Sequence, residues 1–392
     1  DKIDLGSVSA KGYYRNNLLT FDSFSSTNSK GDITGSASLP MKLDYNSINF
    51  GNKVLNEPVD IKMRGSFNHM EFLTEYLSIV DSLRGTVNIE LSINGGWEQL
   101  VRNGKISLED CRLYIGTLGD PITKIDGKGT LKKNILNIDK LQCIKSGNKP
   151  VDKNLFVNGS VDLTHFFNPN YDLLIAGENI LFKSLTDEME GDVNIDLNIS
   201  GGDTVSIIGT ISLNDLILFK EFTTSVSIGK KPVNEEGSLL HYDIDFPIRE
   251  SISLVNSQID AKLNGELHYT KWGNNTADYS GELFFTEGKF YYYSEMFTIS
   301  EGFLYFTRKG FNPTLDIIAM TNIEDEEIQI SFTGPLNEPN LALSSESGFS
   351  QSDIIELLTW GKRFEDESIS YTGLGNQAAE KLEKWLDTQF DR

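Results

Sequence analysis

The sequence predicts a mainly β fold, an antiparallel meander of many strands with few helices. Apolar and polar residues alternate with a period of two along most of the 392-residue chain, which is typical of strands with one buried face. The 34 glycines recur around these alternating runs, where hairpin turns need a residue that tolerates positive φ. Crossover helices do not separate the runs, so a parallel doubly wound sheet is not expected.

The alternating runs define the expected strands in chain order. The runs 85–95, 191–202, 257–269 and 327–334 place large aliphatic residues in one phase and mainly Asn, Asp, Ser, Glu or Lys in the other. Each strand therefore has one apolar and one polar face. We expect turns at Gly85, Gly95, Gly96, Gly104, Gly127, Gly201, Gly202, Gly265, Gly281, Gly288 and Gly302. The candidate lining of the apolar face is Val87, Ile89, Leu91, Ile93, Val193, Ile195, Leu197, Ile199, Val205, Ile207, Ile259, Leu263, Leu267, Leu315, Ile317, Ile328, Ile330 and Phe332.

Three segments have helical periodicity instead. Residues 68–84 place apolar side chains three and four positions apart and predict a helical insertion that ends before Gly85. Residues 350–361 open with Ser350 three positions before Asp353, a weak relative of the capping box. Residues 376–390 carry a third apolar stripe. We expect each stripe to pack on the sheet.

Charge and composition exclude several classes of partner. The chain has 57 acidic and 35 basic side chains and a formal net charge of -22, so no nucleic acid and no anionic membrane surface is expected as a ligand. No apolar run approaches the roughly 20 residues of a spanning helix, so a membrane anchor would lie outside this chain. Cys111 and Cys143 share phase with apolar neighbours and are either buried small hydrophobes or a disulfide between adjacent strands.

The sequence contains no pattern that indicates catalysis. The four histidines are far apart and fit no metal-ligand spacing, and CxxC, GxSxG and phosphate-loop motifs are missing. We therefore predict no enzyme, no catalytic residue, no metal and no cofactor. The acidic run 324–327 is interpreted as a solvated hairpin tip. The aromatic block 284–306 is either packed in the core or forms the wall of an apolar ligand site.

From Phe246 onward, several motifs occur in an order that resembles the C-terminal region of the TamB family, which is related to AsmA-like proteins. The first is FPIRESISLVNSQIDAKLNGELHY, and the second is GKFYYYSEMFTISEGFLYFTRKGFNPTLDIIA. The third is FTGPLNEPNLALSSESGFSQSDIIELLTWGK, in which Gly334, Pro339 and Leu341 precede the helical segment. The resemblance covers residues 246–361, under a third of the chain.

This resemblance implies a long curled β-sheet trough, β-taco-like, with an apolar interior. It divides the chain into a β-trough over 1–245 with the helical insertion near 68–84, a continuation of the trough over 246–347, and a C-terminal helical segment over 348–392. It implies the periplasm of a diderm bacterium, where a full-length protein anchored in the inner membrane bridges to the outer membrane. The implied function is phospholipid transport between the membranes and support of outer-membrane protein assembly, with an Omp85-family barrel of TamA or BamA type as partner.

A sheet with one apolar face must face itself as a sandwich, or curl and hold something else. Phospholipid acyl chains suit such a groove because burial stabilises each CH₂ by roughly 0.8 kcal/mol. Ile354, Ile355, Leu357 and Leu358 are expected to close one end of the groove. The alternative is a scaffold that guides outer-membrane proteins to an Omp85 barrel without carrying lipid. An extracellular adhesin or carbohydrate-active protein is a third and weaker hypothesis.

Overall fold

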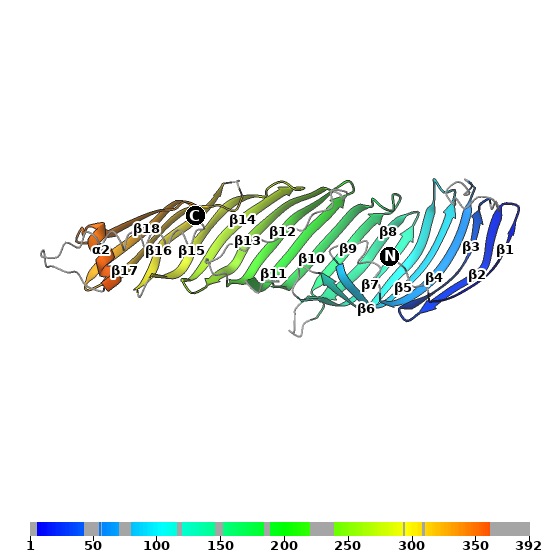
Figure 1. Cartoon of the computed structure of the whole chain (residues 1–392), viewed down its shortest axis with the longest axis horizontal. Coiled ribbons are helices and arrows are strands. Elements are labelled where there is room, and N and C mark those ends of the chain that lie inside the picture. Colours follow the sequence, from blue (N-terminus) through cyan, green and yellow to red (C-terminus); the bar gives the residue numbers. More distant parts are fainter. Residues whose placement is uncertain are drawn as a thin grey trace. The chain divides into compact units, whose positions relative to one another are not determined.

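The structure is a computed structural model that describes residues 6–42, 55, 57–69, 80–115, 120–145, 152–183, 189–219, 239–292, 295–307 and 310–360. Nineteen strands belong to one sheet that does not close on itself (Figure 1). The chain divides into two compact units, Asp1–Leu185 with Ile195–Ile207 and Thr186–Asn194 with Ile208–Arg392. The predicted fold class, a mainly β antiparallel trough, is confirmed.

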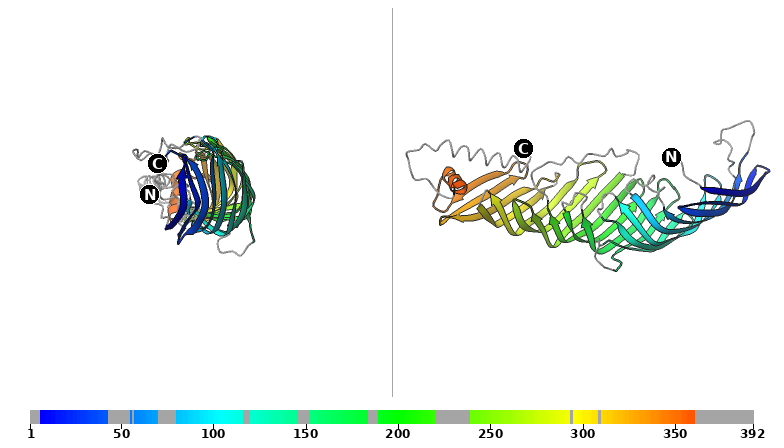
Figure 2. Two further views of the ribbon diagram at one scale, coloured as in Figure 1. Left: turned by 90° about the vertical axis from the view of Figure 1, so that its right-hand side faces the viewer. Right: turned by 60° about the horizontal axis from the view of Figure 1, so that its bottom comes forward.

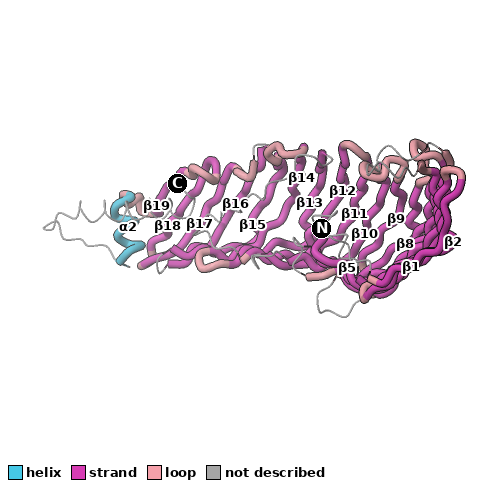
Figure 3. The backbone as a smooth tube through the Cα atoms, turned by 45° about the vertical axis from the view of Figure 1, so that its right-hand side comes forward, coloured by secondary structure: helices cyan, strands magenta, loops and turns pink. Residues whose placement is uncertain are grey.

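Ten strands of the first unit follow one another in sequence and in space. Each pairs antiparallel with the next, so the connections are hairpins and longer loops (Figure 3). Shifts of register interrupt most of these ladders, and such bulges increase the local twist and bend of a sheet. The strands are β1 (Ser7–Arg15), β2 (Leu18–Asn28), β3 (Gly31–Pro40), β4 (Val59–His69), β5 (Val80–Gly95), β6 (Val101–Ile115), β7 (Ile122–Lys132), β8 (Ile135–Ile144), β9 (Leu155–Asp162) and β10 (Asn170–Lys183).

The second unit has the same meander and ends in a helix. Strands β11 (Met189–Gly201) and β12 (Thr204–Leu218) contribute residues to both units. The strands from β13 to β19 again pair antiparallel with their sequence neighbours. The elements are β13 (Leu239–Val255), β14 (Ile259–Trp272), β15 (Asp278–Tyr292), β16 (Glu295–Thr307), β17 (Thr314–Ile323), β18 (Glu326–Pro335), β19 (Asn340–Ser345) and α2 (Gln351–Trp360).

The prediction that glycines mark the turns is wrong for seven of them. The expected turns at Gly95, Gly96, Gly201 and Gly202 are confirmed, since these glycines lie where β5 and β11 end. The structure places the other seven expected turn glycines, Gly85, Gly104, Gly127, Gly265, Gly281, Gly288 and Gly302, inside strands. Gly288 shows the reason, because a Cβ there would lie 2.6 Å from Ile299 Cδ1 and 3.2 Å from Ala261 Cβ. Glycine thus makes room for large neighbours. The tight hairpin at the acidic run instead uses positive φ at Glu324 and Asp325.

The acidic run is only partly a solvated tip. Glu324 and Asp325 form the exposed turn between β17 and β18, but Glu326 is 9% exposed. The Glu326 carboxylate accepts hydrogen bonds from the backbone N–H and the Oγ–H of Ser347, both at 2.7 Å. This carboxylate therefore ties the hairpin to the segment that leads into α2.

The helical predictions have different outcomes. For the predicted insertion, residues 70–79 lie outside the described residues, while β4 extends to His69 and β5 begins at Val80. The ends of the 68–84 stretch are thus strands, because pairing with neighbouring strands outweighs local helical spacing. Residues 376–390 lie outside the described residues. The predicted domain boundaries at 245 and 347 stay predictions.

Helix α2 confirms the predicted cap. The Ser350 N–H donates to Asp353 Oδ2 at 3.2 Å, and the Asp353 N–H donates to Ser350 Oγ at 3.3 Å. This reciprocal pair satisfies donors that the first turn of a helix leaves free. The cap fixes where the helix starts, so that its next residues, Ile354 and Ile355, turn toward the sheet.

The helix completes a buried core at the end of the second unit. Ile354 and Ile355 of α2 belong to one cluster with residues of β15 to β19, and α2 lies beside the last strands in Figures 1 and 2. Phe297 and Ile354 are each 0% exposed. The buried members are Phe290, Tyr292, Phe297, Leu315, Ala319, Ile323, Ile328, Ile330, Phe332, Leu343, Ile354, Ile355, Leu357 and Leu358.

Shortening Ile354 to alanine is expected to release α2 from the sheet. An Ile→Ala change in a packed core costs about 2–5 kcal/mol, so backbone amides of β18 and β19 are expected to exchange hydrogen about 30- to 5,000-fold faster. Hydrogen exchange with mass spectrometry measures this. Ser352→Ala on the exposed side of the same helix is the matched control and should leave exchange unchanged. Equal exchange in the two variants would contradict the packing described.

Candidate functional site

The candidate site is the apolar face of the sheet. On β5, the side chains of Ile89 and Leu91 share a face, and cross-strand partners extend that face to both sides. Ile89 stands opposite Gly65 of β4 and Ile106 of β6, and Leu91 stands opposite Met63. Aliphatic side chains therefore line up in rows that run across the strands, which is the unit of packing in a sheet.

The opposite face of the same strand is polar. Glu90 and Asn94 of β5 are exposed, and Glu90 Oε1 lies 3.2 Å from Arg64 Nε of β4. An ion pair this exposed contributes little stability. The strong contrast between the two faces means that a one-residue slip of register would expose every aliphatic side chain, so the register is firmly specified.

Much of the apolar face is half-buried. Val87 at one end of the β5 row is 1% exposed, but Ile89, Leu91 and Ile93 are intermediate in exposure. Helix α2 packs on the sheet at one end of the second unit. A tightly packed core buries such side chains fully, so this part of the row is not tightly packed.

All eighteen candidate lining residues lie in strands, and none is exposed. Their role as a lining stays a prediction. In the second unit, the members of β17 and β18 lie in or against the α2 cluster, whereas Leu267 of β14 does not. The buried members are Val87, Val193, Val205, Leu263, Leu315, Ile328, Ile330 and Phe332. The half-buried members are Ile89, Leu91, Ile93, Ile195, Leu197, Ile199, Ile207, Ile259, Leu267 and Ile317.

The sequence prediction omitted other residues of the same face. Ile61 and Met63 of β4 and Ile106 and Leu108 of β6 stand in register with the β5 row. Period-two spacing in DIKM and KISL was the signal that could have found them.

The aromatic block has two environments. Phe290 and Phe297 stack with centroids 4.9 Å apart inside the α2 cluster, so this end is core. At the other end of the strands, Phe306 of the block lies 5.3 Å from Phe311, which is 63% exposed. Outside the block, Tyr279 contacts Phe311 at 5.4 Å and Tyr269 at 5.3 Å. The ligand-wall interpretation of the block stays a prediction.

The sequence did not lead us to predict Tyr269 or Tyr279 as lining residues, although Tyr269 continues the period-two phase of Leu263 and Leu267. Burial raises the pKa of both hydroxyls, chiefly because the phenolate would lose hydration. Both hydroxyls therefore stay neutral around pH 7. Neutral phenol groups at the edge of an apolar face suit a boundary between hydrocarbon and water.

The two cysteines are free thiols and do not form a disulfide. Cys111 of β6 stands opposite Ile125 of β7. On the next strand, β8, the residues before and after Cys143 pair with β7 on the two sides of Ile125, so Cys143 lies across from Ile125 as well. Ile125 thus separates the two cysteines by two strand spacings, roughly 9–10 Å, which a disulfide cannot bridge. Burial raises the pKa of Cys143 to about 11 and also raises that of Cys111. The interpretation as buried small hydrophobes fits.

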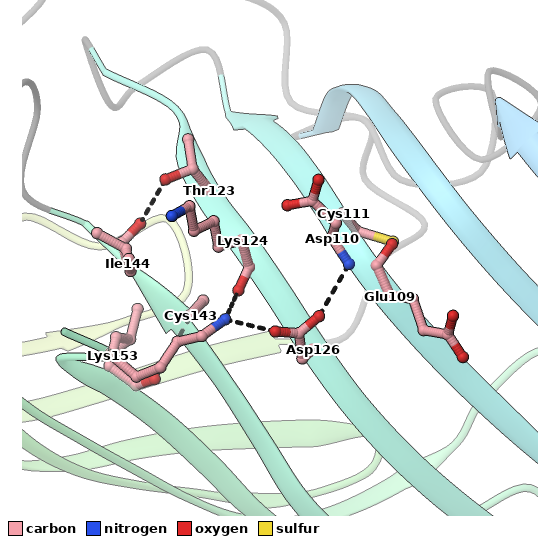
Figure 4. A network of polar contacts seen from close by, with 10 residues as sticks. Glu109, Asp110, Cys111, Thr123, Lys124, Asp126, Cys143, Ile144 and Lys153 are labelled. Atoms are coloured by element: carbon pink, nitrogen blue, oxygen red, sulfur yellow. Dashed lines mark hydrogen bonds and ion pairs between the residues drawn. The ribbon is translucent and has the colours of Figure 1, made fainter.

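A polar network lies next to these thiols (Figure 4). Lys153 Nζ donates to Asp126 Oδ2 at 2.7 Å and to the carbonyl of Lys124, and the Asp110 N–H donates to Asp126 Oδ1 at 2.8 Å. These bonds hold the pKa of Asp126 below its usual range. Lys153 is thus bonded to two protein acceptors, and the network anchors the segment before β9 on β7.

The described residues contain no group of three or more His, Cys, Asp or Glu side chains placed to hold a metal. In the same residues, no helix combines the length and apolar character needed to cross a bilayer.

Comparison with known proteins gives two findings. The family described as TamB C-terminal domain matches residues 146–389. Over 372 residues, the chain is 23% identical to the translocation and assembly module subunit TamB of Haemophilus influenzae, a match that covers 86% of this chain and 28% of that protein. The chain thus spans well under two thirds of the length of this relative.

The thiols provide a test of the site's environment. Because the Cys143 pKa is raised to about 11, its alkylation rate by iodoacetamide should still rise about tenfold per pH unit between pH 8 and pH 10. A cysteine introduced by Ser9→Cys on exposed β1 should level off near pH 9. Peptide mass spectrometry of the folded protein measures both rates. A Cys143 rate that also levels off near pH 9 would show that this face is hydrated.

Proposed function

The chain belongs to the TamB family through its C-terminal domain, and from this premise we propose that it carries phospholipid acyl chains along the apolar face of its sheet. One observation carries the proposal. Ile89, Leu91 and Ile93 form an aligned aliphatic row whose side chains are only half-buried. A hydrocarbon chain would supply the missing contacts.

The energetics favour a mobile occupant. Each CH₂ group buried on the face is stabilised by roughly 0.8 kcal/mol, so an acyl chain gains several kcal/mol by leaving water. Rows of similar aliphatic side chains recur from strand to strand, which makes successive positions nearly equal in energy. A tail can therefore slide with little net change in free energy. Transport of this kind needs no catalytic residue and no cofactor.

The relative from Haemophilus influenzae is named as a subunit of a translocation and assembly module. We therefore place the function in the bacterial envelope, with the full-length protein bridging the inner and outer membranes through the periplasm. An Omp85-family barrel is the proposed partner at the outer membrane. The lipid carried along the face would support outer-membrane protein assembly by supplying the membrane into which those proteins insert.

Helix α2 has a defined place in this function. Ile354, Ile355, Leu357 and Leu358 are buried on β15 to β19, so this part of the apolar face is already covered by protein. We propose that α2 closes one end of the groove and that lipid occupies the half-buried stretch beyond it. Leu267, which lies in the second unit outside the α2 cluster, belongs to that stretch.

The double variant Ile89→Asp with Leu91→Asp should block the groove. Two carboxylates on the apolar face would have to be desolvated by a passing tail, at a cost of several kcal/mol. We expect transfer of fluorescent phospholipid between donor and acceptor vesicles to fall by about tenfold or more.

The matched control is Ser92→Asp with Asn94→Asp, which adds the same charge at the same spacing on the opposite face of β5. Its transfer rate should equal that of the unmodified chain. Circular dichroism checks that both variants keep their strands. Equal transfer by the two double variants would refute the proposed lipid path.

The alternative function is a scaffold that guides outer-membrane proteins to an Omp85 barrel without carrying lipid, by pairing their strands with a sheet edge through main-chain hydrogen bonds. Under this alternative, the Ile89→Asp, Leu91→Asp variant would still support outer-membrane protein assembly in cells.

A further inference from the structure

Lys145 is a buried lysine without a partner. Its side chain is 2% exposed, and its Nζ is shielded from solvent with no hydrogen-bond acceptor within reach in the described residues. An isolated ammonium buried in this way is costly, and buried lysines are normally paired. The position therefore calls for an explanation.

The backbone of Lys145 is firmly held. Its N–H donates to Asn154 Oδ1 at 2.9 Å, and its carbonyl accepts from the Leu181 N–H at 2.9 Å and from Asn154 Nδ2 at 3.3 Å. Asn154 Nδ2 also donates to the carbonyl of Asn179 at 3.0 Å. Segments next to β8, β9 and β10 thus position this lysine independently of its side chain.

The lysine lies where the apolar face meets the edge of the sheet. It follows β8 by one residue, and period-two spacing from Leu141 and Cys143 places it on their face. Cys143 is 2% exposed and Leu181 is 7% exposed, so the surroundings are apolar. Because neighbouring strands are antiparallel, one long side of the sheet is formed by alternating strand ends and strand starts. On this side lie the ends of β6, β8 and β10 and the starts of β7 and β9. Lys145 therefore stands at the rim of the candidate groove.

No described carboxylate is paired with the Lys145 ammonium, which can therefore bind an incoming anion. Burial lowers the pKa of Lys145, while the negative charge of Asp120 opposes that shift. Neither Asp120 nor any other described carboxylate forms an ion pair with Lys145. The neighbouring cation, Lys153, is bonded to Asp126 and to the Lys124 carbonyl (Figure 4). An anion arriving at this rim would thus find one uncommitted ammonium.

We propose that Lys145 binds the phosphate group of a ligand whose hydrocarbon part lies on the adjacent apolar face. This inference rests on the proposed lipid path and adds a headgroup subsite to it. An ammonium can donate three hydrogen bonds to phosphate oxygens, and charge-assisted bonds of this kind are strong. The rotatable bonds of the lysine stem let Nζ turn from its buried position toward an anion at the rim. A phospholipid and free inorganic phosphate share this chemistry.

The test compares three ligands on the purified chain: phosphatidylglycerol, diacylglycerol with the same acyl chains, and inorganic phosphate. Lys145→Met removes the charge and keeps an unbranched side chain. We expect it to bind phosphatidylglycerol about tenfold more weakly, a loss of about 1.4 kcal/mol, with diacylglycerol binding unchanged. Lys140→Met, at an exposed position of β8, removes the same charge and should change neither affinity.

Two further arms keep the outcomes distinct. Lys145→Arg retains the charge and should restore phosphatidylglycerol binding, while unchanged diacylglycerol binding by Lys145→Met shows that the variant is folded. If inorganic phosphate binds at Lys145 as tightly as phosphatidylglycerol does, and displaces it, the site would be assigned to free phosphate. Full phosphatidylglycerol affinity in Lys145→Met would overturn the phosphate site and leave the lipid path standing. Failure of the unmodified chain to bind both lipids would overturn the lipid path, and the headgroup subsite with it.

Discussion

The structure depends on one constraint: a long sheet with an apolar face must have that face covered. Folding normally meets this requirement with a second layer of sheet or helix. Here, the described residues supply such a layer at one end, where α2 packs on β15 to β19. Elsewhere, some residues of the face, such as Val87, are buried, while others, such as Leu91, stay half-buried. The half-buried part of the face is the feature that suits an external apolar occupant.

The same constraint explains features that look unrelated. Glycines inside strands, such as Gly129, make room for the large side chains of Ile106 and Leu136, whose carbons would each lie 3.0 Å from an added Cβ. The ring contacts of Tyr269, Tyr279 and Phe311 place groups with both apolar and polar character at one edge of the face. The strand glycines allow large side chains to form a continuous apolar face, and the tyrosine hydroxyls give its edge polar groups that water can hydrate.

Period-two alternation predicted much of this from sequence, since a strand's two faces follow directly from its spacing. The cap of α2 was also predictable, because Ser350 and Asp353 interact within one turn. Features that depend on register were not predictable. Gly288 was assigned to a turn because glycine has the same signal at a turn and at a crowded strand position. Lys145 gave no signal, because the residues that hold its backbone, Asn154 and Leu181, approach it only in the folded sheet.

Photo-crosslinking along a single strand tests the central claim most directly. With benzoylphenylalanine placed one position at a time along β5 in cells, phospholipid should crosslink to the protein at Ile89, Leu91 and Ile93. No lipid adduct should form at Glu90, Ser92 or Asn94 on the opposite face. This alternation would locate the acyl chains on the apolar face. Equal yields at odd and even positions, or no lipid adduct at any of them, would contradict the account.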